Sequence, residues 1–262
     1  ELKKEKLEAD LDIARRIQQS TLPSELPRLN GYDIVGLSEP ADETGGDAYD
    51  VIDQRGFIES GARAGGDALI FMADATGHGV GPAISVTQVL AMVRMSCRLG
   101  ATLQRLASQV NNQLCTDLPI GRFVTAFTGE LDVSAHVVRY ISAGQAPLLF
   151  IRGDDTAHED IADTLPAAMP MGIDPDFEIE GTARVEMHPG DVLVVLSDGY
   201  YEAMDPQGNM LGMEAIVNRV RENKQRSAAQ TLDALRRLVD SHAKGRPADD
   251  DRTAVIVKRL PA

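Results

Sequence analysis

The chain has 262 residues, of which 43% are hydrophobic and 25% are charged, and its formal net charge is -14 at pH 7. The hydrophobic share suits a globular protein with a core, whereas the acidic charge argues against binding nucleic acid or an anionic membrane, which need clustered Lys and Arg. Because it contains neither an uninterrupted apolar run of about eighteen residues nor a charged-then-apolar leader, we expect a cytoplasmic protein without direct membrane contact.

The N-terminal segment 1–20 has apolar residues at helical spacing among Glu and Lys, which predicts an amphipathic helix that ends before Pro23. This helix either packs on its own domain or ends a coiled coil that joins an upstream sensor to the domain. Because the chain begins with Glu1 inside the helix, we expect a longer protein whose upstream region could be a membrane-attached sensor. We assign residues 1–28 to this linker or regulatory helix and expect it to mediate homodimerisation.

The rest of the chain, 29–262, is predicted to form one domain. Strands are predicted at 35–38, 47–53 and 68–74, helices at 81–99 and 103–115, and further strands at 123–131, 137–142, 147–151, 182–186 and 191–197. Helical periodicity returns at 213–220 and 228–242, before a closing strand at 253–259. Because strands and helices do not alternate strictly, this order favours an α+β fold with largely antiparallel sheets.

Four aspartates stand at the edges of apolar runs, within Gly45-Gly46-Asp47, Asp74-Ala75-Thr76-Gly77-His78-Gly79, Ser197-Asp198-Gly199 and Asp250-Asp251-Arg252-Thr253. Hard divalent cations prefer oxygen ligands, and glycines let the backbone come close to such a site. The pattern therefore predicts a two-metal site. Each motif alone is weak, since the acidic run 249–251 also suits a solvated loop and the segment 197–199 suits a strand-ending turn.

The aspartates converge only if two pairs of strands are antiparallel neighbours. Pairing of 47–53 with 68–74 would place Asp47 beside Asp74, and would leave Asp67 about 23 Å away at the turn end. Pairing of 191–197 with 253–259 would bring Asp198 and Asp250 to one edge in the same way. We expect His78 to hydrogen-bond within its glycine turn and assign it no catalytic role.

In order and character these motifs resemble the metal-dependent PPM phosphatases (the phosphatase 2C type), specifically their bacterial SpoIIE or RsbU-like branch. The resemblance extends to Ser142-Ala143-Gly144, Met171-Gly172-Ile173 and the continuation Tyr200-Tyr201-Glu202-Ala203. Six motifs in the right order are together highly specific. The resemblance implies a four-layer αββα sandwich, with two central, mainly antiparallel sheets flanked by helices and the metals at one edge.

The resemblance also implies two bound ions, Mn²⁺ or Mg²⁺. Asp74 would bridge them, the Ala75 carbonyl would add an oxygen, Asp198 and Asp250 would hold the second ion, and Asp47 would contribute directly or through a water. The implied reaction is hydrolysis of a phosphoserine or phosphothreonine by a metal-activated water. The implied substrate is a small bacterial regulator of the STAS fold, of the anti-anti-sigma type, in a partner-switching pathway.

Two positions depart from the pattern of this branch. Gln145 stands where an Ala-Gly-His motif often has His, and Thr44 stands where an aliphatic residue is common. Neither is an implied metal ligand, so we expect altered substrate preference or loop detail with activity retained. The sequence contains no clear counterpart of the phosphate-binding Arg of the eukaryotic relatives.

Other functions explain fewer of these residues. A dinucleotide-binding domain would use the glycines of 77–81, but Pro82 occupies the third motif position. A nucleotide cyclase of the Gly-Gly-Asp-Glu-Phe type would use 45–47 and leave Asp198 and Asp250 without a role. Serine hydrolase and zinc peptidase motifs are absent from the sequence. The main rival is a catalytically weak phosphatase-like scaffold that binds a phosphorylated partner, and the presence of all four aspartates argues against it.

Overall fold

The computed structural model describes residues 2–56, 66–145, 148–154, 161–162, 167–177, 179 and 181–261. The elements in chain order are α1 (Leu2–Thr21), β1 (Tyr32–Glu39), β2 (Asp47–Asp53), β3 (Ala68–Ala75), α2 (Val80–Arg98), α3 (Leu103–Asp117), β4 (Val124–Asp132), β5 (Val137–Ala143), β6 (Leu148–Ile151), β7 (Ile161–Ala162), β8 (Ala167–Ala168), β9 (Ala183–Glu186), β10 (Val192–Leu196), the one-turn 3₁₀ helix η1 (Asp198–Tyr200), α4 (Met213–Asn223), α5 (Ala228–Ala243) and β11 (Arg252–Arg259). Each predicted element is present, with bounds that shift by a few residues, whereas β7, β8 and η1 were not predicted. Pro147, at the start of one predicted strand, lies outside the described residues.

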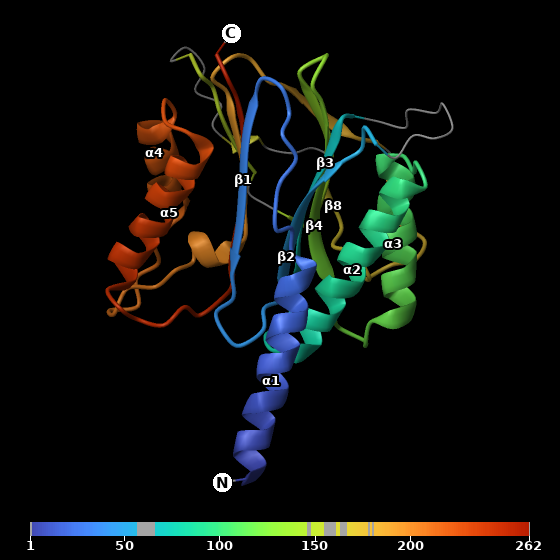
Figure 1. The fold of residues 1–262 in the computed structure, drawn as a ribbon, viewed down its shortest axis with the longest axis vertical. Helices are drawn as coiled ribbons and strands as arrows, with labels where there is room; N and C mark the ends of the chain where they lie inside the picture. Colours follow the sequence, from blue (N-terminus) through green and yellow to red (C-terminus); the bar gives the residue numbers. More distant parts are fainter. Residues whose placement is uncertain are drawn as a thin grey trace.

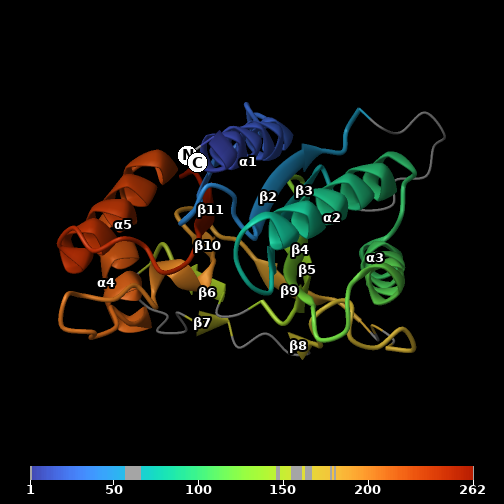
Figure 2. The same ribbon diagram turned by 90° about the horizontal axis from the view of Figure 1, so that it is seen from below.

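Two sheets form the centre of the molecule. Within the described chain, a first sheet of five strands has the order β1-β11-β10-β6-β7, and a second sheet of six strands follows the path β2-β3-β4-β5-β8 with β9 paired to β5. Every pairing between these strands is antiparallel except that of β5 with β8. Helices α2 and α3 cover the second sheet, and α4 and α5 cover the first (Figures 1 and 2). The predicted four-layer αββα sandwich is confirmed.

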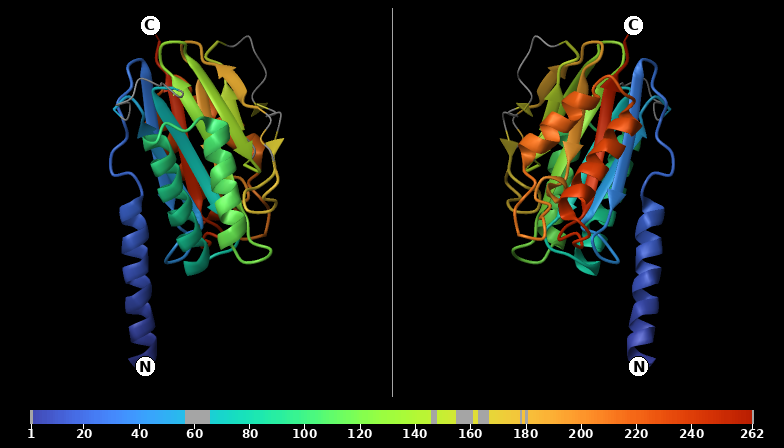
Figure 3. Two further views of the ribbon diagram at one scale, coloured as in Figure 1. Left: turned by 90° about the vertical axis from the view of Figure 1, so that its right-hand side faces the viewer. Right: turned by 90° about the vertical axis from the view of Figure 1, so that its left-hand side faces the viewer.

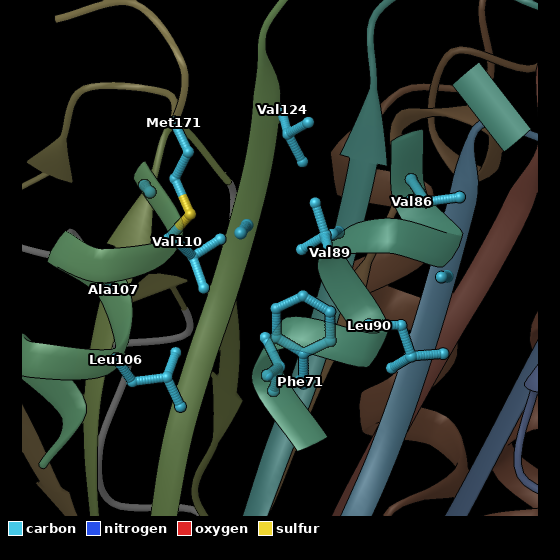
Figure 4. Close-up of a cluster of buried hydrophobic side chains, with 14 of the residues drawn as sticks. Phe71, Val86, Val89, Leu90, Leu106, Ala107, Val110, Val124 and Met171 are labelled. Atoms are coloured by element: carbon cyan, nitrogen blue, oxygen red, sulfur yellow. The ribbon is translucent and has the colours of Figure 1, made fainter. Parts of the chain in front are cut away.

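Three hydrophobic cores fill the spaces between the four layers. Phe71 and Leu90 belong to the core between the second sheet and its helices, part of which Figure 4 shows. Met72 and Val195 belong to the core between the two sheets, and Ile256 belongs to the core under α4 and α5. Because successive strand residues point to opposite faces, each central strand contributes to two cores at once. This alternation fixes which strand-end side chains face the space between the sheets.

By length and apolar composition, α2 is the one helix of the described chain that would suit a membrane span. Seven of its residues are buried, among them Val86, Leu90 and Val93. These side chains belong to the core over β2 and β3, so α2 is a helix of the protein core.

Helix α1 packs on α2, and its N-terminal turns run beyond the sandwich, past the end at which β2 begins (Figures 1 and 3). Its other end is tied down. Arg94 of α2 donates a hydrogen bond to the Thr21 carbonyl at 2.8 Å and also bonds the Asp50 carboxylate at 2.7 Å. Leu22, which follows the helix, packs against two of the hydrophobic cores.

Glu130 is a buried carboxyl group in the layer between the second sheet and its helices. It lies on β4 opposite Leu69 of β3 and is 3% exposed. Burial raises the pKa of Glu130 to about 7, although the charge of Arg139 and a hydrogen bond with Gln54 act in the opposite direction. Because this pKa exceeds the ordinary value of 4.5, the folded protein holds the Glu130 proton more tightly than the unfolded chain does. The resulting contribution to the unfolding free energy is fully present below pH 4.5 and is lost as the pH rises through 7.

Glu130→Gln is therefore expected to change the pH dependence of stability. The amide does not ionise, so the difference in unfolding free energy between variant and wild type should shift in favour of the variant by up to about 3 kcal/mol between pH 5 and pH 8.5. Urea unfolding in the presence of a chelator measures this difference. Glu222→Gln, at an exposed position of α4, is the control, and a pH profile for Glu130→Gln parallel to that of wild type would contradict the prediction.

Candidate metal centre

The β2–β3 hairpin brings the first two aspartates together. Asp47 stands directly opposite Asp74 in the antiparallel register, and Tyr49, on the same face as Asp47, lies in the core between the sheets. The predicted pairing is confirmed. Asp67 lies at the opposite end of the hairpin, as predicted, where its carboxylate accepts a hydrogen bond from the Val133 amide at 2.8 Å.

The second pair of aspartates lies where β10 ends and β11 begins. These strands are antiparallel neighbours, and the Ser197 amide donates to the Thr253 carbonyl at 2.9 Å just beyond their ladder. Asp198 follows as the first residue of η1. Gly199 packs directly on the backbone that leads into β11, and a Cβ at this position would clash with the Asp251 carbonyl oxygen and lie 3.1 Å from that of Asp250. Only glycine allows this approach, which brings Asp198 and Asp250 to one edge.

The two pairs belong to different sheets, and Asp251, next to Asp250, links them because its Oδ2 accepts the Gly46 amide at 2.5 Å. The pKa of Asp74 is raised to about 7. Burial is the largest cause, and the negative charges of Asp198, Asp250 and Asp251 contribute the rest. Burial and the charge of Asp250 likewise raise the pKa of Asp198. Such mutual effects arise between carboxylates that lie near one another. The acidic edge of the sandwich is therefore one cluster.

Asp47 has the most buried carboxylate of this cluster, at 3% exposed. Burial, followed by the charges of Asp74 and Asp251, raises the pKa of Asp47 well above its ordinary value, while the hydroxyls of Thr253 and Ser197 lower it in part. Within the described structure, its Oδ2 atom has no hydrogen-bond partner. Because buried polar atoms are nearly always paired, an orphaned carboxylate oxygen here fits a ligand to a cation.

The remaining donors lie at the same edge. A Cβ at Gly46 would stand 2.8 Å from the Ala75 carbonyl oxygen, so this carbonyl lies beside the loop that leads to Asp47. In the part of the chain that the structure describes, no three carboxylate, imidazole or thiol groups already surround one point as a finished ion shell. Like charges repel in such a site, so the side chains must turn toward an ion to coordinate it. The available oxygens are nevertheless the hard donors that suit Mg²⁺ or Mn²⁺.

Asp251 is a residue of this edge that our sequence analysis did not single out. Its Oδ1 accepts the Ala41 amide at 2.7 Å, and its Oδ2 accepts the amides of Gly46 at 2.5 Å and Asp47 at 3.3 Å. Alternate residues of β11 face the core between the sheets, and Asp251 continues that alternation whereas Asp250 does not. Strand periodicity extended backwards from β11 would have distinguished the two neighbouring aspartates.

Gln145, the first departure from the expected motif, is buried and connects the two sheets. Its Nε2 donates to the Leu196 carbonyl at 2.8 Å, and its Oε1 accepts from the Thr125 hydroxyl at 3.3 Å. Thr125 pairs with Asp74 in the β3–β4 register. Gln145 therefore holds the β10 end close to the Asp74 end of the second sheet.

Thr44 and His78, which the sequence analysis also discussed, differ in their exposure to solvent. Thr44 is 2% exposed in the segment before β2. His78 is highly exposed, and its Nδ1 lies 3.5 Å from the Asp42 carboxylate. The prediction that His78 bonds within its glycine turn is wrong, because the turn directs the imidazole toward the loop before β2.

Arg122 is a second residue that the sequence analysis missed. Its Nη1 donates to the Thr76 carbonyl at 2.7 Å, and two bonds between Thr76 and Phe123 hold the same junction. Within the described residues Arg122 has no carboxylate partner, in contrast to Arg246 and Arg252 near the same edge. A guanidinium bound to Thr76, two residues beyond Asp74, is thus left available for an anion.

Comparison with known proteins agrees with this geometry. A family model described as Stage II sporulation protein E (SpoIIE) matches residues 64–260. The phosphoserine phosphatase RsbU of Bacillus subtilis (strain 168) is 22% identical over 259 residues, which cover 97% of this chain and 71% of RsbU. The sequence resemblance to the SpoIIE or RsbU-like branch is therefore confirmed.

Solved structures show the same fold. The SiaA-PP2C domain of Pseudomonas aeruginosa is similar with a TM-score of 0.77 and 19% identity, over 98% of this chain and 98% of that domain. A crystal structure of RsbX in complex with magnesium is similar with a TM-score of 0.62 and 13% identity, over 89% of this chain and 98% of RsbX. At these identities the likeness establishes the fold alone.

The two neighbouring aspartates are expected to respond in opposite ways to substitution. Asp251→Asn would turn an amide donor toward backbone N–H groups, so the unfolding free energy should fall by about 2 kcal/mol. Asp250→Asn removes one charge from a repelling cluster and should leave the metal-free stability unchanged or raised. Urea unfolding with a chelator compares them. A loss in Asp250→Asn as large as that in Asp251→Asn would contradict this division of roles.

Proposed function

The chain belongs to the SpoIIE family, and we propose that it is a metal-dependent protein serine/threonine phosphatase whose metal centre is the acidic edge of the sandwich. One observation carries the proposal. Carboxylates from both sheets, at Asp47, Asp74, Asp198 and Asp250, converge at one edge where burial and mutual repulsion raise the pKa of several of them. Bound cations would offset the negative charge of such a cluster.

In this proposal each donor has a distinct place. Asp74 would contact both ions, Asp198 and Asp250 would hold one, and Asp47 with the Ala75 carbonyl would complete the other. When bound, two divalent ions, Mn²⁺ or Mg²⁺, would supply an activated water for attack on phosphorus and positive charge to offset that of the phosphoryl oxygens. The RsbX structure in complex with magnesium supports divalent metal in this fold family.

The residues around the donors hold the edge in place. Asp251 fixes the backbone that leads to Asp47, and Gln145 keeps the two sheets together beside Asp74. Arg122, at the rim, offers a guanidinium to the phosphate of an incoming substrate, since Arg pairs well with phosphate oxygens. These assignments separate ion binding, framework and substrate anchoring among different side chains.

We propose a phosphoserine or phosphothreonine on a bacterial regulatory protein as the substrate, specifically a STAS-fold regulator of the anti-anti-sigma type in partner switching. Similarity to a protein named phosphoserine phosphatase supports the chemistry. We further propose that 29–262 is the phosphatase domain, that 1–28 is a linker or regulatory helix able to dimerise, and that the enzyme works in the cytoplasm.

The alternative is a catalytically weak scaffold that binds a phosphorylated partner without hydrolysing it. One observation favours it, namely that the described residues contain no finished ion shell. The presence of all four acidic donors at a single edge favours the enzyme, because a binding scaffold would not need to bury repelling carboxylates.

Mn²⁺-dependent hydrolysis of p-nitrophenyl phosphate tests the enzyme against the scaffold. Wild type should turn over the ester only with added metal. Asp198→Asn should lower the rate by more than about 100-fold, since even outer partners of metal ligands are worth 10- to 100-fold, while circular dichroism shows an intact fold. Asp233→Asn, exposed on α5, is the control. Metal-independent or absent turnover by wild type would refute the proposed activity, and an unaffected rate in Asp198→Asn would refute its assigned role.

Arg122→Ala should raise the KM for the same ester by about tenfold, the equivalent of one charge-assisted hydrogen bond, with a smaller change in kcat. Arg122→Lys should recover part of the loss because it keeps the charge without the planar fork. Steady-state kinetics at saturating Mn²⁺ separates the two constants. Arg105→Ala, exposed near the start of α3, is the matched control, and equal KM values for the two alanine variants would refute substrate anchoring by Arg122.

A further inference from the structure

Gln18 of α1 makes two hydrogen bonds to a single residue far along the chain. Its Nε2 donates to the Gly45 carbonyl at 2.6 Å, and the Gly45 amide donates to its Oε1 at 3.1 Å. A carboxamide can both donate to and accept from the backbone of one residue, so it makes the same pair of hydrogen bonds that a neighbouring strand would make. Gln18 is half-buried by this contact, whereas the next residue, Gln19, is exposed.

The contact is made at the loop that leads into the acidic edge. On the opposite side of that loop, a Cβ at Gly45 would lie 2.5 Å from the Asp251 Oδ2 atom, which accepts the amides of Gly46 and Asp47. The Gly46 carbonyl in turn accepts the Ala75 amide at 3.0 Å. Residues 45–47 are therefore held from the core side by Asp251 and from the outside by Gln18.

Two consecutive glycines make this loop dependent on such contacts. Glycine loses more backbone freedom on ordering than any other residue, so an unrestrained Gly45-Gly46 segment samples many conformations. The loop delivers Asp47, whose Oδ2 has no hydrogen-bond partner in the described structure. A small change in the path of the loop would therefore move that oxygen directly.

Helix α1 can serve as a brace because its C-terminal turn is fixed. Arg94 binds the Thr21 carbonyl, one turn beyond Gln18, and Leu22 packs into the cores. The N-terminal turns of α1 project past the sandwich (Figure 3). Gln18 thus touches the loop close to the fixed end of a helix whose other end projects from the sandwich.

We propose that Gln18 is a positioning residue for the metal centre, which holds Gly45 so that Asp47 stands in place to receive an ion. This inference rests on the proposed function, since it concerns the same site. Its consequence is that the centre is complete only while α1 is docked. A force or partner that shifts α1 along α2 would break both hydrogen bonds at once and weaken ion binding.

The test compares Gln18→Ala and Gln18→Asn with Gln19→Ala in the full chain. Mn²⁺ binding is measured by the signal of free Mn²⁺ in electron paramagnetic resonance and by the rise in thermal unfolding midpoint on Mn²⁺ addition. Both Gln18 variants should bind Mn²⁺ about tenfold more weakly than wild type, because the shorter Asn amide does not reach Gly45. Gln19→Ala should bind as wild type does, and saturating Mn²⁺ should restore turnover of p-nitrophenyl phosphate in the Gln18 variants.

Each outcome decides the inference. Mn²⁺ affinities of both Gln18 variants equal to that of Gln19→Ala, with wild type active, would overturn the positioning role and leave the phosphatase proposal intact. Wild type that neither binds Mn²⁺ nor turns over the ester would overturn both. If Gln18→Ala does not fold, Gln18→Asn carries the comparison, since it keeps an amide on the helix surface. Asn at wild-type affinity would overturn the claim that reach to Gly45 matters.

Discussion

The structure depends on confining several carboxylates at one edge of two facing sheets. Asp47, Asp74 and Asp198 are each partly or wholly desolvated there, and each has its pKa raised by burial first and by neighbouring negative charge second. In an ordinary core this arrangement would be costly, because buried charges without partners are strongly destabilising. The fold tolerates it because three hydrophobic cores stabilise the sandwich away from this edge and because the edge is open to cations.

Strand periodicity explains how much of this could be predicted from the sequence. The period of two along β2 and β3 places Asp47 and Asp74 on the face that Tyr49 and Met72 share, so the apolar pattern supported the hairpin, whereas its exact register is seen only in the structure. The pairing of β10 with β11 was a condition of the predicted site, and the structure supplies it. The helices were recognisable by their 3.6-residue spacing, and only their ends shifted.

The features that were not predicted are contacts between side chains and distant backbone. Gln145 bonding Leu196, and Gln18 bonding Gly45, leave no periodic trace in the sequence, because any exposed polar position of a helix or loop looks the same until the partner is placed beside it. Asp251 was not predicted as part of the site for another reason. In a run of three acidic residues a solvated loop is the ordinary expectation, and only the inward alternation of β11 singles out one member.

Asp251 and Gln18 both hold the Gly45–Asp47 segment, but they belong to different parts of the fold. Asp251 directly precedes a strand of the central sheets, so its hydrogen bonds to the Gly46 and Asp47 amides persist for as long as the protein is folded. Gln18 belongs to a helix that is fixed at one end and projects from the sandwich at the other. Its two hydrogen bonds to Gly45 can therefore break without the unfolding of any sheet. Since the fold must hold the carboxylates together against their mutual repulsion before an ion binds, a loss of positioning at Asp47 lowers ion affinity. The N-terminal helix is thereby connected to the site by two hydrogen bonds between the Gln18 side chain and the Gly45 backbone.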